Sequence, residues 1–87
     1  MSNKKHITKT KIYGASVTVI DTQAGGLSVE IDLGKDCYGN AQWVHAKRRN
    51  QRHNWFVNMS QTYGASVDRT EPASMTSQEI ISKYLAG

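Results

Sequence analysis

The fold is decided by the stretch Leu27-Ser-Val-Glu-Ile-Asp-Leu33, in which apolar and polar residues alternate without interruption. Successive side chains of a strand point to opposite faces, so the four aliphatic residues share one face and the polar residues share the other. One face of such a strand is buried and one lies in water, which is typical of an antiparallel sheet. The sequence therefore predicts a sheet with one buried side around this stretch.

A second strand is predicted just before it, over residues 11–22. Thr, Ile and Val dominate this segment, and four of its residues share one parity: Tyr13, Ala15, Val17 and Val19. The intervening Gln23-Ala-Gly-Gly26 is interpreted as a tight turn, because paired glycines adopt positive φ without steric cost. Residues 11–33 are therefore predicted to form an antiparallel hairpin.

A second hairpin is predicted further along the chain. Aromatic and β-branched residues indicate strands over 42–47 and 55–61, with residues 48–54 as the tip between them. Residues 34–40 and 62–73 contain Gly, Asn, Asp or Pro, and we interpret both as connections. The sheet is thus expected to have about four strands in two hairpins.

The pentapeptide Tyr-Gly-Ala-Ser-Val occurs twice, at 13–17 and 63–67, and a further Tyr-Gly dipeptide begins at Tyr38. The three tyrosines are 25 residues apart. A true repeat carries similar patterning through each unit, whereas these segments continue as an acidic hairpin, a basic hairpin and a helix. We interpret the recurrence as coincidence or local duplication, although the second complete copy leaves open a fifth strand over 62–68.

A helix is predicted at the C-terminal end of the sequence. Thr76-Ser-Gln-Glu79 matches the capping box, and Met75 and Ile80 occupy the flanking hydrophobic-staple positions. An apolar stripe follows, consisting of Ile80, Ile81, Tyr84 and Leu85. A helix of about ten residues is marginal alone, so it must pack on the sheet. The predicted fold class is α+β: a small antiparallel sheet with one C-terminal helix on one face.

With 87 residues, the chain is long enough for one domain. Residues 1–10 are polar and basic and predict a flexible basic arm, and residues 11–87 predict a single α+β domain. The expected core consists of Tyr13, Val17, Val19, Leu27, Val29, Ile31, Leu33, Trp43, Val57, Met59, Ile80, Ile81, Tyr84 and Leu85.

Cys37 is the only cysteine, which excludes an internal disulfide and suits a reducing compartment. Neither a membrane-spanning apolar stretch nor a signal-peptide core is found, so we expect the cytoplasm of a bacterial cell or an infected host. The spacing of Cys37, His45 and His53 matches no standard zinc pattern. No metal site and no cofactor are predicted.

The charge of +4 is unevenly placed. Residues 1–12 and 45–54 each carry four cations and no carboxylate, whereas residues 13–36 have a net charge of −3. The second basic run lies between two tryptophans, and such a loop can grip phosphates while exposed tryptophans stack bases. The predicted nucleic-acid or partner contacts are Lys47, Arg48, Arg49, Arg52, His45, His53, Trp43, Trp55, Lys9 and Lys11. The plainer interpretation is a solvated hairpin tip with at least one tryptophan in the core.

These features predict a non-enzymatic binding module that contacts nucleic acid, or a nucleic-acid–protein complex, through a basic β-hairpin. No catalytic residue is assigned. The alternative is a protein-binding inhibitor or adaptor of phages or mobile elements, of the anti-CRISPR or anti-restriction type, because the chain is compact and carries oppositely charged surfaces. A third is a small endoribonuclease that uses the two histidines and the arginines of the loop. No membrane partner is expected, and a homodimer would bring two basic hairpins together.

Overall fold

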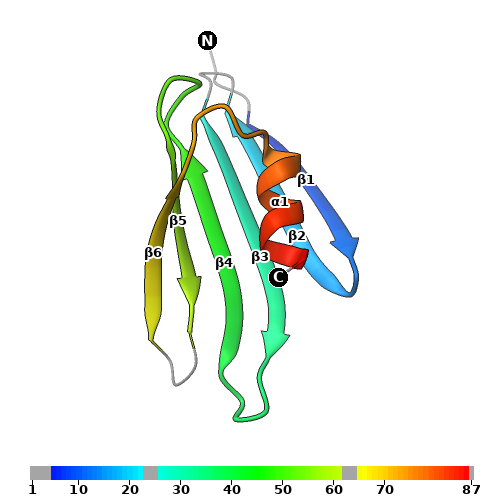
Figure 1. Cartoon of the computed structure of the whole chain (residues 1–87). Helices are drawn as coiled ribbons and strands as arrows, with labels where there is room; N and C mark the ends of the chain where they lie inside the picture. The colour runs from blue at the N-terminus through cyan, green and yellow to red at the C-terminus, as the bar shows by residue number, and fades with distance from the viewer. Residues whose placement is uncertain (1–4, 23–25, 62–64, 87) are drawn as a thin grey trace.

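A computed structural model describes residues 5–22, 26–61 and 65–86 (Figure 1). The strands form one antiparallel sheet in sequence order, and a helix lies across one of its faces. The elements are β1 (Lys5–Ile12), β2 (Ala15–Thr22), β3 (Leu27–Lys35), β4 (Ala41–Arg48), β5 (Trp55–Ser60), β6 (Ser66–Glu71) and α1 (Ser77–Ala86). The prediction of a small α+β fold with one C-terminal helix on the sheet is confirmed. The number of strands was wrong, because the sheet has six rather than about four.

The first missed strand is β1, which includes residues 5–10 of the predicted basic arm. The expected strand over 11–22 is instead broken at Tyr13 and Gly14, which both have positive φ and form the turn between β1 and β2. Lysine and threonine dominate β1 because it is an edge strand with little buried surface, so it lacks the apolar alternation that marks a strand in sequence. Residues 1–4 of the arm lie outside the described residues.

The second missed strand is β6, at the opposite edge of the sheet. It occupies part of the segment 62–73, which the sequence analysis interpreted as a connection. Its only buried side chain is that of Glu71, so the sequence of β6 has no alternation of apolar residues that would indicate a strand. The alternative of a strand over 62–68 has the right region but the wrong bounds, since β6 starts at Ser66; residues 62–64 lie outside the described part of the chain.

The core lies between the sheet and α1. Its buried residues are Ala15, Val17, Val29, Ile31, Val44, Ala46, Trp55, Val57, Ile80 and Ile81. The alternation predicted for residues 27–33 holds for Val29 and Ile31, which are 0% and 1% exposed. Five further predicted core residues are only partly buried and pack against this cluster: Val19, Leu27, Met59, Tyr84 and Leu85.

Three predicted core residues lie elsewhere. Tyr13 is 95% exposed because it occupies a turn, and Leu33 is 43% exposed where the register between β3 and β4 shifts. Trp43 lies on the other side of the sheet, because the buried face of β4 carries Val44 and Ala46. The prediction was wrong because it placed the largest side chain of β4 in the core. The larger pair, Trp43 and His45, faces away from α1, and the smaller pair, Val44 and Ala46, faces it.

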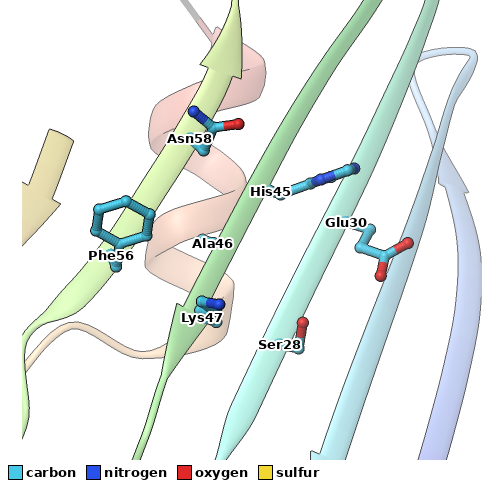
Figure 2. A pocket seen from close by; sticks show the side chains of 7 residues that line it. All are labelled: Ser28, Glu30, His45, Ala46, Lys47, Phe56 and Asn58. Carbon is cyan, nitrogen blue, oxygen red and sulfur yellow. The ribbon is translucent and has the colours of Figure 1, made fainter. Parts of the chain in front are cut away.

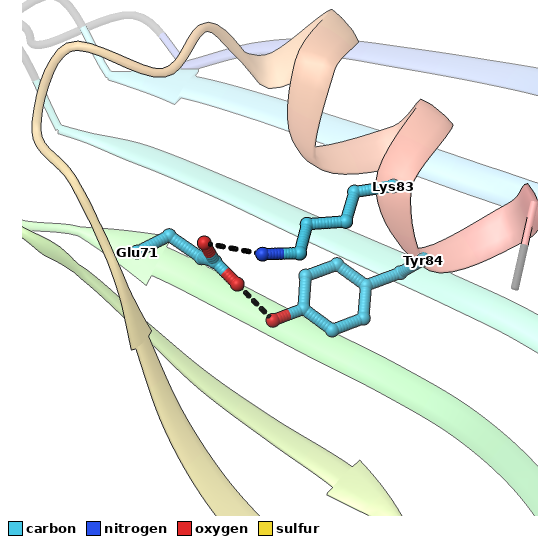
Figure 3. A network of polar contacts seen from close by, with 3 residues as sticks. All are labelled: Glu71, Lys83 and Tyr84. Atoms are coloured by element: carbon cyan, nitrogen blue, oxygen red, sulfur yellow. Dashed lines mark hydrogen bonds and ion pairs between the residues drawn. The ribbon is translucent and has the colours of Figure 1, made fainter.

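The helix is fixed at both ends. In the predicted capping box, the Thr76 amide donates to Glu79 Oε1 at 2.9 Å and the Glu79 amide donates to Thr76 Oγ1 at 3.2 Å, as expected. Further along α1, Lys83 Nζ donates to the buried Glu71 Oε1 at 2.9 Å, and the Tyr84 hydroxyl donates to Glu71 Oε2 (Figure 3). Glu71 therefore ties α1 to the edge strand β6.

The connections lie alternately at the two ends of the sheet, as an antiparallel meander requires (Figure 1). The tyrosine end carries the turns that contain Tyr13-Gly14 and Tyr38-Gly39, and both glycines have positive φ. The basic end carries the end of β2, the start of β3 and residues 49–54 between β4 and β5. The 25-residue spacing of the Tyr-Gly dipeptides thus equals one two-strand unit, and the third copy falls on residues 62–64, outside the described residues.

Candidate functional site

The sheet has two unlike faces. α1 covers one of them, and within the described residues no element covers the other, which we call the open face (Figures 1 and 2). Trp43, His45 and Lys47 project from β4 onto this open face, since the side chains between them are directed into the core. The rings of Trp43 and His45 lie with centroids 4.7 Å apart.

The predicted basic loop forms a compact tip, residues 49–54. Asn50 organises it: its Oδ1 accepts from the Arg52 amide at 2.8 Å and contacts His53 Nδ1 at 2.8 Å, while its carbonyl accepts from the His53 amide at 3.2 Å. Asparagine bonds its own backbone two residues on in this way at many turns. The side chains of Arg49, Arg52 and His53 are exposed on this ordered backbone.

Gly26, just before β3, lies close to the start of the tip. A Cβ on Gly26 would lie 2.9 Å from Thr22 Oγ1 and 3.2 Å from the Arg49 carbonyl oxygen, so only glycine fits there without displacement. The Gly26 amide donates to Thr22 Oγ1 at 3.1 Å, and the Thr22 amide donates to the Gly26 carbonyl at 3.0 Å. Gly26 thus lies close to the backbone at the start of the tip.

Two of the predicted contact residues are used inside the fold. Arg48 points to the covered face, where its Nη1 donates to the Ala73 carbonyl at 2.9 Å and its guanidinium lies 5.0 Å from the centre of the Trp55 ring. Trp55 is 0% exposed, and its Nε1 donates to the Met75 carbonyl at 2.9 Å. Arg48 and Trp55 therefore hold the connection between β6 and α1 rather than face a partner.

The remaining predicted residues lie in three places. Lys47, Arg49, Arg52 and His53 lie at or next to the basic tip. Trp43 and His45 lie further along β4, and Lys9 and Lys11 lie on β1, three strands away from β4 in the sheet. The structure thus brings together four of the ten residues that the sequence predicted as one interface.

One residue that the sequence analysis missed lies beside the tip. Phe56 is 43% exposed, and it lines a hollow of about 430 Å³ beside the tip. The other residues that line this hollow are Lys47, Arg48, Arg49, His53 and Asn54. The position of Phe56 in the sequence carried a signal, because it has the opposite parity to Trp55 and Val57, which share the buried face of β5. Two further hollows, of about 360 and 350 Å³, lie on the open face around Glu30 and His45. Figure 2 shows the first of them.

The residues considered for zinc are not gathered. Cys37 is exposed at the tyrosine end, whereas His53 lies in the tip at the basic end. Among the described residues there is no group of three or more His, Cys, Asp or Glu side chains that could hold a metal ion. The described chain likewise contains no helix that is long and apolar enough to span a bilayer.

Comparison with known proteins finds no protein family, no curated protein and no solved structure that matches the chain. The basic tip and the open face are the two surfaces from which a function can be inferred.

Proposed function

We propose that this protein is a non-enzymatic binding module that contacts nucleic acid, or a nucleic-acid–protein complex, through its basic tip. The observation that supports the proposal is the ordered tip itself: Arg49, Arg52 and His53 are exposed on a backbone held by Asn50, with Lys47 on the adjoining strand. The segment 45–54 contains no carboxylate to neutralise them.

The physical basis is electrostatic. A cationic tip attracts the phosphate backbone, and each arginine presents a planar fork that can bond two phosphate oxygens. Because the tip is already ordered, little conformational entropy is lost on binding. Arg48 and Trp55 have no part in this contact, since their side chains bond the β6–α1 connection.

The test is fluorescence anisotropy with labelled single-stranded DNA, single-stranded RNA and duplex DNA of about 20 nucleotides. For duplex DNA, three or four phosphate contacts predict that affinity falls by about 40-fold to 150-fold between 50 and 200 mM salt, taking a slope near −0.9 per contact. Arg49→Glu with Arg52→Glu should abolish binding at either salt concentration.

The matched control is Lys11→Glu with Lys35→Glu, which changes the net charge equally but lies at the tyrosine end of the molecule. This control should retain most of the affinity. If both double variants weaken binding alike, net charge rather than the tip is responsible. If the wild-type protein binds none of the three probes at 50 mM salt, the proposal is wrong.

The second candidate is a protein-binding inhibitor or adaptor of the kind carried by phages and mobile elements. It is favoured by the open face, where the carboxylates of Glu30 and Asp32 line shallow hollows together with Trp43 and His45. A protein partner seated there would still bind after the charges of the tip are reversed. The single exposed Cys37 suits action in a reducing compartment, and we place both candidates in the cytoplasm of a bacterial cell or an infected host.

A small endoribonuclease is the third candidate, and we favour it least. General acid and general base must both reach one reacting phosphate. His45 projects from β4, whereas His53 lies in the tip and contacts Asn50.

A further inference from the structure

The open face carries an ordered row of polar side chains that crosses all six strands. In register, the row runs Lys9, Thr18, Glu30, His45, Asn58 and Asp68, from β1 to β6. The only side-chain hydrogen bond along this row, among the described residues, runs from Asn58 Nδ2 to Asp68 Oδ1 at 2.6 Å. The row therefore has a cation at one edge, a carboxylate at the other, and a carboxylate beside an imidazole at its centre.

If the same row of a second copy is placed against this one in the reverse order, the two rows are complementary. A cation meets a carboxylate at each edge, a hydroxyl meets an amide next to it, and Glu30 meets His45 at the centre. We propose that the open face binds the open face of a second copy of this chain, about a twofold axis that runs parallel to the strands between β3 and β4. A twofold interface requires this property, because each residue that contacts a second residue is contacted by its counterpart in return.

A second row supports the same pairing. It runs Ile7, Ile20, Ser28, Lys47, Phe56 and Thr70 across the sheet. The same rotation brings Ile20 onto the partner's Phe56 and the partner's Ile20 onto Phe56. Phe56 is 43% exposed and Ile20 is half-buried, so their contact would remove apolar surface from water on both sides.

Charge also distinguishes between the two ways of stacking the faces. If the twofold axis ran across the strands along the first row, Lys9 would face the partner's Lys9 and Glu30 would face the partner's Glu30. Like charges in direct opposition are unfavourable, so this arrangement is excluded on electrostatic grounds. The axis parallel to the strands also suits the aligned packing of two sheets, in which the mean strand directions stay within about 30° of each other.

The size of the open face is adequate for a specific dimer. Six strands spaced about 4.8 Å apart, with a rise of about 3.3 Å per residue, give a face of roughly 600 Å² in projection. Its accessible area is larger than the projection because side chains stand out from the sheet. It thus approaches the roughly 800 Å² per partner that a standard interface buries.

An axis parallel to the strands leaves both basic ends on the same side of the dimer. The two tips, residues 49–54 of each copy, would then face one ligand together. The interface itself needs no nucleic acid, so this proposal does not depend on the proposed function.

The first test is sedimentation velocity of the full chain without nucleic acid, from about 5 to 500 µM. We expect a reversible monomer–dimer equilibrium with a dissociation constant of about 1–100 µM, as for a mixed polar and apolar interface of this size. A protein that stays monomeric throughout this range would overturn the proposal.

The second test identifies the surface. Lys9→Asp and Asp68→Lys should each weaken the dimer by about 10-fold, because each places like charges opposite each other at two symmetric positions. The double variant that carries both changes should regain the wild-type affinity. Lys9 and Asp68 lie on opposite edge strands of one chain, so this rescue can arise only between chains.

The matched control is Arg69→Asp, which reverses one charge on β6 but on the covered side of the sheet. It should leave the dissociation constant within about twofold. Circular dichroism and thermal melting of every variant check that the chain is folded. A dimer that Lys9→Asp and Asp68→Lys leave unchanged, or that the double variant fails to restore, would assign association to another surface and overturn the proposal.

Discussion

The two faces of this sheet use polar groups in opposite ways. On the covered face, the charged side chains of Arg48 and Glu71 bond to other parts of the same chain: Arg48 to the β6–α1 connection and Glu71 to α1. On the open face, Lys9 and Glu30 face solvent. A buried charge needs partners to offset the loss of hydration, whereas an exposed charge remains available for a ligand. The charged groups of one face therefore stabilise the fold, whereas those of the other face are exposed to solvent.

The adjacent residues Trp55 and Phe56 give the sharpest way to test this comparison, since they lie on opposite faces of β5. Trp55→Ala removes a fully buried ring and its hydrogen bond to the Met75 carbonyl, and should lower the free energy of unfolding by about 3–5 kcal/mol. Urea denaturation monitored by circular dichroism measures this.

Phe56→Ser is the matched control, and should change the free energy of unfolding by less than about 1 kcal/mol at concentrations where the protein is monomeric. Equal losses from the two substitutions would contradict the division of roles between the faces.

The next largest effect is expected at Glu71, whose carboxylate holds Lys83 and Tyr84 of α1 (Figure 3). Glu71→Ala leaves the Tyr84 hydroxyl without its acceptor and should cost about 1–3 kcal/mol of unfolding free energy. Glu79→Gln keeps a capping-box side chain and removes one exposed negative charge of α1, so it serves as the control and should cost less than about 0.5 kcal/mol. If the control matched Glu71→Ala, net charge rather than the buried contact would explain the loss.

The same contact predicts a dependence of stability on pH. Burial and the hydrogen bond to Glu71 raise the pKa of Tyr84 from 10.0 to about 12. The unfolded chain therefore loses this proton first, so the contribution is fully present below pH 10 and is lost as pH rises through about 12.

At acid pH, stability should fall as pH falls, because the hydrogen bonds from Tyr84 and Lys83 lower the pKa of Glu71 below its ordinary value of 4.5. Its contribution is present above that value and is lost as pH falls through the lowered pKa. Thermal melting against pH should show both losses, and Tyr84→Phe should remove the alkaline one. An alkaline loss that persists in Tyr84→Phe would assign the effect to another group.

The smallest effect is expected outside both faces, at the tyrosine end. Tyr13 has a φ of 52°, a conformation that asparagine and glycine adopt more easily than tyrosine, and its side chain is 95% exposed. Tyr13→Asn should therefore stabilise the protein by about 0.5–1 kcal/mol, measured by urea denaturation. A loss of stability would show that the ring makes a contact that favours the turn.

The sequence predicted those elements in which one buried face makes apolar residues recur at regular intervals. β3 alternates because one of its faces is buried, and α1 begins at a capping box that forms as expected. The edge strands β1 and β6 were missed for the converse reason, because a strand that hydrogen-bonds to one neighbour and buries almost nothing needs no apolar period.

The candidate site was predictable in part. The run of cations at 45–54 located the tip correctly in a hairpin connection, but the sequence could not show which of its members point inward. Arg48 and Lys47 are adjacent and chemically alike, and only the direction of the pleat separates a side chain that bonds the Ala73 carbonyl from one on the open face. The proposed contact between chains depends on register across six strands, which no local pattern encodes.

The meander order of the strands has a kinetic consequence. Every strand pairs only with its neighbours in sequence, so each pairing closes a short loop and loses little chain entropy. Hairpins can then form locally and add strands one after another, and such low contact order favours folding in milliseconds or faster. The longest loop to close joins β6, through α1, back to β3 across the sheet. Docking of the helix is therefore the step expected to limit the rate, and substitutions in its apolar stripe should slow refolding more than substitutions in the hairpin turns.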